Sequence, residues 1–137
     1  MSERFFLDTS ALVALDEREP GAEEVESILA RAWLQDATAH ASFATLTELE
    51  YICTQEKDAE AASELLAFVK AQPIEWVHTD ESLCSKAAKI KAANKVSFAD
   101  AFVAASALQL NATLVHKDPE FEALKGIIKT QPLPLKG

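Results

Sequence analysis

The sequence is poor in glycine, proline and cysteine, and each shortage argues against a class of protein. Only 3 glycines and 5 prolines occur in 137 residues, and no internal repeat or low-complexity linker divides the chain. The two cysteines, Cys53 and Cys84, are too few for a disulfide scaffold and lack the close pairing of a zinc site, so both are expected to be buried, reduced thiols. The length predicts a single domain over residues 1–137.

Long apolar runs are also missing. No segment approaches the roughly 20 apolar residues that a membrane span requires. Residues 1–4 lead directly into an apolar strand, without the pattern of a signal peptide. A soluble, cytoplasmic protein with no membrane partner is therefore expected.

Basic residues are scarce in the first half of the chain. Residues 1–68 hold 4 basic and 15 acidic side chains, whereas residues 69–137 hold 9 and 7, for a formal net charge of −9. The negative net charge argues against a polyanionic partner, but the acidic excess lies in the first half of the chain. A lysine cluster in the second half could face a nucleic acid or form the solvated face of a helix, and the sequence leaves both open: Lys86, Lys89, Lys91 and Lys95.

Apolar strands and helical patterns alternate along the chain, which predicts an α/β fold with a parallel sheet. Strands are expected at 4–7, 37–41, 74–77, 113–115 and 127–128. Helices are expected at 22–35, 43–54, 57–71 and 98–110, from the cap Thr79-Asp80-Glu81 to about Ala93, near Thr9, and as a short turn opened by Asp118-Pro119. The tail 131–137 is expected on the surface.

Three aspartates stand where the carboxyl ends of parallel strands would meet at one edge of the sheet. Asp8 follows the first strand, Asp118 follows strand 113–115, and Asp100 lies in the first turn of helix 98–110. Each has a structural explanation as well, because Asp8 and Asp118 could be N-caps and Asp100 could pair with Ser97 in a capping box. The pattern alone leaves capping and a shared site open.

Asp100 is the aspartate that a cap explains least well. Helix 98–110 carries no other charge and is apolar nearly all round, which predicts that it is buried. A buried carboxylate is costly unless it is paired, protonated or bound to a cation. A cluster of carboxylates would suit Mg²⁺ or Mn²⁺, and such an ion beside a phosphate supports phosphodiester hydrolysis.

A fourth acid in segment 45–50 cannot be chosen from the pattern. On a helix, Glu48 and Glu50 point about 200° apart, so at most one of them faces inward. Solvent exposure is the ordinary expectation for both.

Four segments, taken in order, resemble the PIN-domain family: Phe6 to Leu12, Thr45 to Leu49, Ser97 to Ala105 and Leu114 to Phe121. The resemblance implies a three-layer α/β/α fold with four to five parallel strands, and a ribonuclease that uses Mg²⁺ or Mn²⁺. It selects Glu48 over Glu50, and it implies the site acids Asp8, Glu48, Asp100 and Asp118. Ser10 matches a polar position near the family's active site, where it would contact substrate or cap the first helix.

The compact length resembles the toxins of VapBC toxin–antitoxin pairs, which are PIN ribonucleases silenced by a protein partner. That resemblance implies an RNA substrate, single-stranded or looped, and an antitoxin. A homodimer is expected as well, because a second copy could extend a positive groove. A PIN protein of RNA processing and an inactive binding module remain alternatives. An aspartate-dependent phosphatase is a further one, although Ser10 stands where that class needs a second aspartate.

One position departs from the family. His116 stands two residues before the fourth acid, where the family usually carries Thr or Ser. It could contact phosphate or tune a metal site, or it could be a partly exposed histidine that is merely tolerated. The substitution leaves the local hydrogen bonding open.

Overall fold

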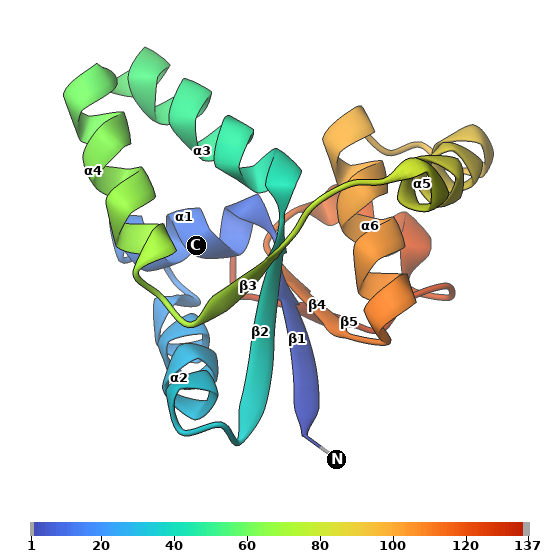
Figure 1. Ribbon diagram of the computed structural model, residues 1–137, viewed down its shortest axis with the longest axis horizontal. Helices are drawn as coiled ribbons and strands as arrows, with labels where there is room; N and C mark the ends of the chain where they lie inside the picture. The colour runs from blue at the N-terminus through green and yellow to red at the C-terminus, as the bar shows by residue number, and fades with distance from the viewer. Residues whose placement is uncertain (1, 136–137) are drawn as a thin grey trace.

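The computed structural model describes residues 2–135, which form one five-stranded parallel sheet between two layers of helices (Figure 1). The strand order is β3-β2-β1-β4-β5. The strands are β1 (Glu3–Leu7), β2 (Ala37–Ser42), β3 (Ile74–Val77), β4 (Thr113–His116) and β5 (Thr130–Pro132). The predicted three-layer α/β/α fold is confirmed. Residues 1, 136 and 137, at the limits of the predicted domain and tail, lie outside the described residues.

Six α-helices in the described chain cover the two faces of the sheet. One layer holds α1 (Thr9–Glu17), α2 (Ala22–Trp33), α3 (Phe43–Glu56) and α4 (Ala59–Lys70). The other holds α5 (Glu81–Ala93) and α6 (Phe98–Leu110), with the 3₁₀ helix η1 (Pro119–Leu124). None of these helices combines the length and apolarity that a bilayer span needs.

Alternating side chains of β1 join the two layers to the sheet. Phe5 and Leu7 belong to the core shared with α1–α4, whereas Phe6 belongs to the core shared with α5, α6 and η1. This is the period-two alternation of a strand that is buried on both faces. The central strand of the sheet is thus held rigidly from both sides.

The helix starts have local causes that sequence reasoning could find. Ser97 caps α6 by accepting the Asp100 N–H at 3.1 Å, and Asp80 caps α5 by accepting the Leu83 N–H at 2.8 Å. The predicted burial of the helix at 98–110 is also confirmed, because eight consecutive residues from Asp100 to Ala107 are buried.

Three expectations were wrong. Ile127 and Ile128 form a turn, not a strand, because their N–H groups donate to the Leu124 carbonyl at 2.8 and 3.0 Å and Ile128 packs into the core. The last strand begins at Thr130 instead. The tail is only partly on the surface, since Leu133 is buried and its N–H donates to the His116 carbonyl at 2.7 Å. Cys84 is exposed rather than buried, while Cys53 is buried as expected.

The topology creates a crevice at the carboxyl ends of the two neighbouring strands β1 and β4. After β1 the chain moves through β2 to the sheet edge at β3, then returns past β1 to β4 on the other side. Connections therefore leave these two neighbouring strands in opposite directions, which creates a crevice at their carboxyl ends where ligands usually bind. Asp8 follows β1 directly, and Asp118 follows β4 by two residues.

Candidate active site

A pocket of about 660 Å³ lies at the carboxyl ends of β1 and β4. The four acids predicted as site residues all line it, although they come from four separate parts of the chain: Asp8, Glu48, Asp100 and Asp118. Glu19, Glu120 and Lys117 line it as well. The Lys117 ammonium donates to the Pro20 carbonyl at 2.8 Å and pairs with Glu19 at 3.4 Å. The pocket is therefore strongly acidic.

Asp8 uses one carboxylate oxygen as a cap and keeps the other free. Oδ2 accepts hydrogen bonds from the Ser10 N–H at 3.1 Å and the Ser10 hydroxyl at 2.6 Å. Oδ1 is buried and has no hydrogen-bond partner among the described residues. Burial raises the pKa of Asp8 to about 6, and the charges of Glu48 and Asp118 add to this against the opposing Ser10 bonds. The predicted cap therefore occupies only one of the two oxygens of this side chain.

Asp100 takes part in only half of the predicted capping box. Ser97 accepts the Asp100 N–H, but the Ser97 N–H donates to Glu120 Oε2 at 3.1 Å instead of to Asp100. The carboxyl of Asp100, a residue that is only 6% exposed, is thereby released from capping. Burial is the main cause that raises its pKa to about 9, followed by a hydrogen bond with Glu120 and the negative charges of neighbouring acids.

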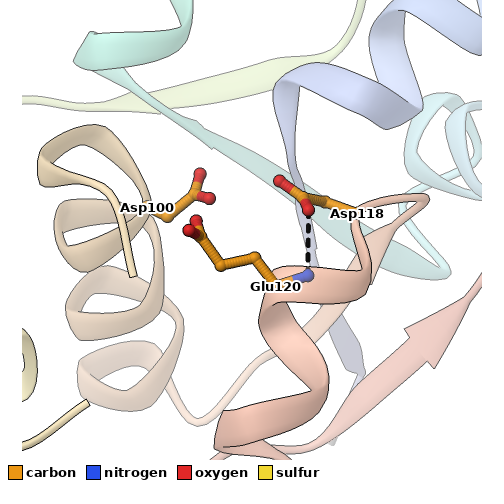
Figure 2. A group of neighbouring side chains, drawn as sticks. All are labelled: Asp100, Asp118 and Glu120. Carbon is orange, nitrogen blue, oxygen red and sulfur yellow. Dashed lines mark hydrogen bonds between the residues drawn. The ribbon is translucent and has the colours of Figure 1, made fainter. Parts of the chain in front are cut away.

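Asp100, Asp118 and Glu120 form the tightest acidic group of the site (Figure 2). One carboxylate oxygen from each lies within 4.8 Å of the others. Asp118 also caps η1, since its Oδ1 accepts the Glu120 N–H at 2.9 Å. In Figure 2 the three carboxylates point toward one another, Asp100 from α6 and the other two from the start of η1.

Glu120 is the site residue that sequence reasoning missed. Its signal was the run Asp118-Pro119-Glu120, in which proline starts a helical turn and brings the acid back beside the cap. The hydrogen bond with Asp100 is the largest cause that lowers the pKa of Glu120. At neutral pH, the pair therefore shares one proton or holds a cation in its place.

Glu48 and Glu50 are distinguished by the fold. Glu48 lines the pocket and accepts a hydrogen bond from the Thr9 hydroxyl on Oε1 at 2.7 Å, whereas Glu50 is exposed. The two side chains leave α3 in different directions, as their spacing predicts.

Ser10 connects the loop that follows β1 to the loop that follows β4. Its hydroxyl donates to Asp8 and accepts the Lys117 N–H at 2.9 Å, across 107 positions of sequence. Ser10 lines the pocket, so it lies where its predicted contact with substrate would require. Its single proton is nevertheless committed to Asp8.

His116 is buried rather than partly exposed, at 2% of its surface, and it does not line the pocket. Its Nδ1 accepts the Asp118 N–H at 3.1 Å, and its ring packs edge-on against Phe121 at 5.1 Å. Burial lowers the pKa of His116, which favours the neutral ring that this acceptor role needs. His116 thus supplies the acceptor beside the fourth acid at a position where a hydroxyl was expected.

The donor set of the pocket fits a hard divalent cation. Its acidic groups offer oxygen atoms only. One, on Asp8, is buried and unpaired in the part of the chain that the structure describes, and three others gather at Asp100, Asp118 and Glu120. Zinc would be expected to recruit cysteine or histidine, whereas Mg²⁺ and Mn²⁺ prefer carboxylates. A cation here would also relieve the charge repulsion that raises the pKa values of Asp8 and Asp100.

Comparisons with known proteins agree with this architecture. The model of the PIN domain matches residues 5–127. Among solved structures, VapBC2 from Rickettsia felis, bound to a DNA fragment of its promoter, is similar with 17% identity, coverage of 96% of this chain and 99% of that one, and a TM-score of 0.75.

VapC20 from Mycobacterium tuberculosis, described as a sarcin–ricin loop cleaving toxin, gives 19% identity, coverage of 95% and 99%, and a TM-score of 0.70. PAE2754 from Pyrobaculum aerophilum is 23% identical, with coverage of 94% of this chain and 92% of that one, and a TM-score of 0.67. At these identities the likeness establishes the fold. The comparison with curated proteins found no match.

Proposed function

The chain belongs to the PIN domain family, and on that premise we propose that it is a metal-dependent endoribonuclease that hydrolyses RNA phosphodiesters. The observation that carries the proposal is the convergence of Asp8, Glu48, Asp100 and Asp118 on one pocket at the β1–β4 crevice. A structural neighbour described as a sarcin–ricin loop cleaving toxin supports the choice of RNA.

Mg²⁺ or Mn²⁺ would be held by Asp8, Glu48, Asp100 and Asp118, with Glu120 beside them. When bound, such an ion polarises phosphate oxygens and lowers the pKa of coordinated water. The chain's own residues prepare the acids for this. Ser10 engages Asp8 Oδ2 and leaves Oδ1 free, and the His116 ring accepts the N–H of Asp118.

Single-stranded or looped RNA is the substrate class that the pocket supports best. A crevice at a sheet edge can admit a splayed backbone, whereas a rigid duplex presents its phosphates on a broad cylinder. The acidic character of α1–α4 would repel polyanions that do not bind specifically.

We further propose that the protein is a cytoplasmic toxin of a VapBC-type pair, held inactive by an antitoxin and assembled as a homodimer. Support comes from several structural neighbours that are VapBC complexes. An adjacent reading frame for a small DNA-binding protein that co-purifies with this chain would support the toxin role. Its absence would favour a PIN protein of RNA processing.

The proposal predicts RNA cleavage that requires Mg²⁺ or Mn²⁺ and stops in EDTA. Asp8→Asn retains the helix cap, since asparagine caps equally well, yet removes the charged ligand oxygen. Asp8→Asn and Asp100→Asn should each lower the cleavage rate by about 100-fold or more. The measurement is single-turnover cleavage of a labelled single-stranded RNA.

Glu50→Gln is the matched control, because Glu50 is exposed on the same helix as Glu48. It should cleave like the wild type. Full metal-dependent activity in either aspartate variant would refute the proposal. A wild-type protein that shows no site-specific heat on titration with Mn²⁺ would identify a binding module instead of an enzyme.

A further inference from the structure

Two buried threonines connect Glu48 to the residue next to Asp8. Thr9 is the first residue of α1 and is 7% exposed, while Thr45 lies in the first turn of α3 and is fully buried. The Thr9 hydroxyl oxygen lies 2.9 Å from that of Thr45 and 2.7 Å from Glu48 Oε1. The three side chains thus form a continuous hydrogen-bonded chain between two helices.

The direction of this chain follows from counting protons. An ionised carboxylate only accepts hydrogen bonds, so the single hydroxyl proton of Thr9 is committed to Glu48. The contact between the two hydroxyls then needs the proton of Thr45, with Thr9 as the acceptor. The bonds run from Thr45 to Thr9 to Glu48, and the last is charge-assisted and strengthened by the first.

We propose that Thr9 is a positioning residue that holds the Glu48 carboxylate for metal binding, and that Thr45 orients the Thr9 hydroxyl. Without this contact, Glu48 would be a half-buried side chain with free rotation about several bonds. Thr9 occupies Oε1 and leaves Oε2 available for a cation. Because Thr9 follows Asp8 directly, the start of α1 sets two acids of the site at once. The inference rests on the proposed function, since it requires Glu48 as a ligand.

Titration of the full-length protein with Mn²⁺ by calorimetry tests the proposal. Thr9→Val removes the hydroxyl at nearly constant volume and should weaken Mn²⁺ binding by about 10-fold. Thr9→Ser keeps the donor and should remain within about twofold of the wild type. Thr45→Val leaves the bond from Thr9 to Glu48 in place and should lose less affinity than Thr9→Val. Thr47→Val, at an exposed position of the same helix, should change nothing.

A double variant separates positioning from stability. Thr9→Val alone leaves the buried Thr45 hydroxyl without its partner, which lowers the melting temperature. Thr9→Val with Thr45→Val removes both hydroxyls and should recover that melting temperature while Mn²⁺ binding stays weak. Affinity that recovers together with stability would overturn the positioning role.

Two failures are distinguishable. If the wild type binds Mn²⁺ and Thr9→Val binds it with equal affinity, the positioning role is overturned and the proposed function still stands. A wild-type protein that binds no Mn²⁺ would overturn the proposed function and this inference with it.

Discussion

Asp8 and Asp118 each cap a helix with one carboxylate oxygen, so capping and metal binding do not compete at these residues. A cap needs a single acceptor, and a carboxylate has two oxygens. On Asp8 the second oxygen is buried and has no partner within residues 2–135, and Asp118 joins the group formed with Asp100 and Glu120. The structural and chemical interpretations of these aspartates are therefore compatible within the same side chain.

Asp100 should make the metal-free protein less stable as pH rises. Its pKa is raised by folding, so the folded state holds the proton more tightly than the unfolded chain. The stabilising contribution is complete below the unfolded pKa near 4 and is lost as pH rises toward 9. Asp100→Asn cannot ionise and should therefore be more stable than the wild type in EDTA at pH 8, by at least about 2 kcal/mol.

Urea unfolding followed between pH 5 and pH 9 measures this difference, which should grow with pH. Saturating Mg²⁺ should reverse the order, because it stabilises only the protein that binds it. Glu50→Gln again serves as the control. A metal-free Asp100→Asn protein that is less stable than the wild type at pH 8 would contradict the prediction.

The connection between α1 and α2 meets the C-terminal segment that follows β5. Gly21 precedes α2 with a φ of +102°, a conformation that L-amino acids rarely adopt. A Cβ at this position would lie 2.9 Å from the Cβ of Leu133, which is buried. Two elements from opposite ends of the chain thus share one tightly packed contact.

Gly21→Ala should destabilise the fold by about 2–4 kcal/mol, through left-handed strain and overpacking against Leu133. Thermal and urea unfolding measure the change. Gly126→Ala is the matched control, because a Cβ at Gly126 meets no atom of the described residues within 4 Å. The stability of this variant should remain within about 1 kcal/mol of the wild type. Equal stability of the two variants would show that the contact between α2 and the C-terminal segment is not tight in solution.

Across the whole molecule, the acidic site borders a basic helix. The lysines of α5 are exposed, and Lys91 donates to the Val96 carbonyl at 2.8 Å beside Ser97, which lines the pocket. The charge of Lys91 also contributes to the lowered pKa of Glu120. Lys91 therefore places a positive charge next to the carboxylates, where it can attract RNA phosphates.

Replacing Lys89 and Lys95 together by glutamine should weaken the binding of single-stranded RNA to a similar extent for all sequences. The slope of log affinity against log salt should fall by about 1–2, since phosphate contacts are lost. Mn²⁺ binding should not change. Lys70→Gln, exposed at the end of α4 in the opposite layer, is the control. If the double variant binds RNA as the wild type does, these lysines form only a solvated surface and do not contact RNA.

The sequence by itself determined the α/β class, the positions of most helices and the burial of α6. These features depend on helix caps and on hydrophobic periodicity, which are local patterns contained within about 15 consecutive residues.

Only the tertiary structure decided which distant groups meet. Glu120 joins Asp100 because η1 packs beside α6, Thr9 reaches Glu48 because α1 packs against α3, and β5 forms at Thr130 because that segment lies in register with β4. Such contacts depend on strand order and on the packing of helices across the sheet, and no local pattern encodes them. The candidate acids can therefore be identified from the sequence, while the groups that they contact are determined by the tertiary structure.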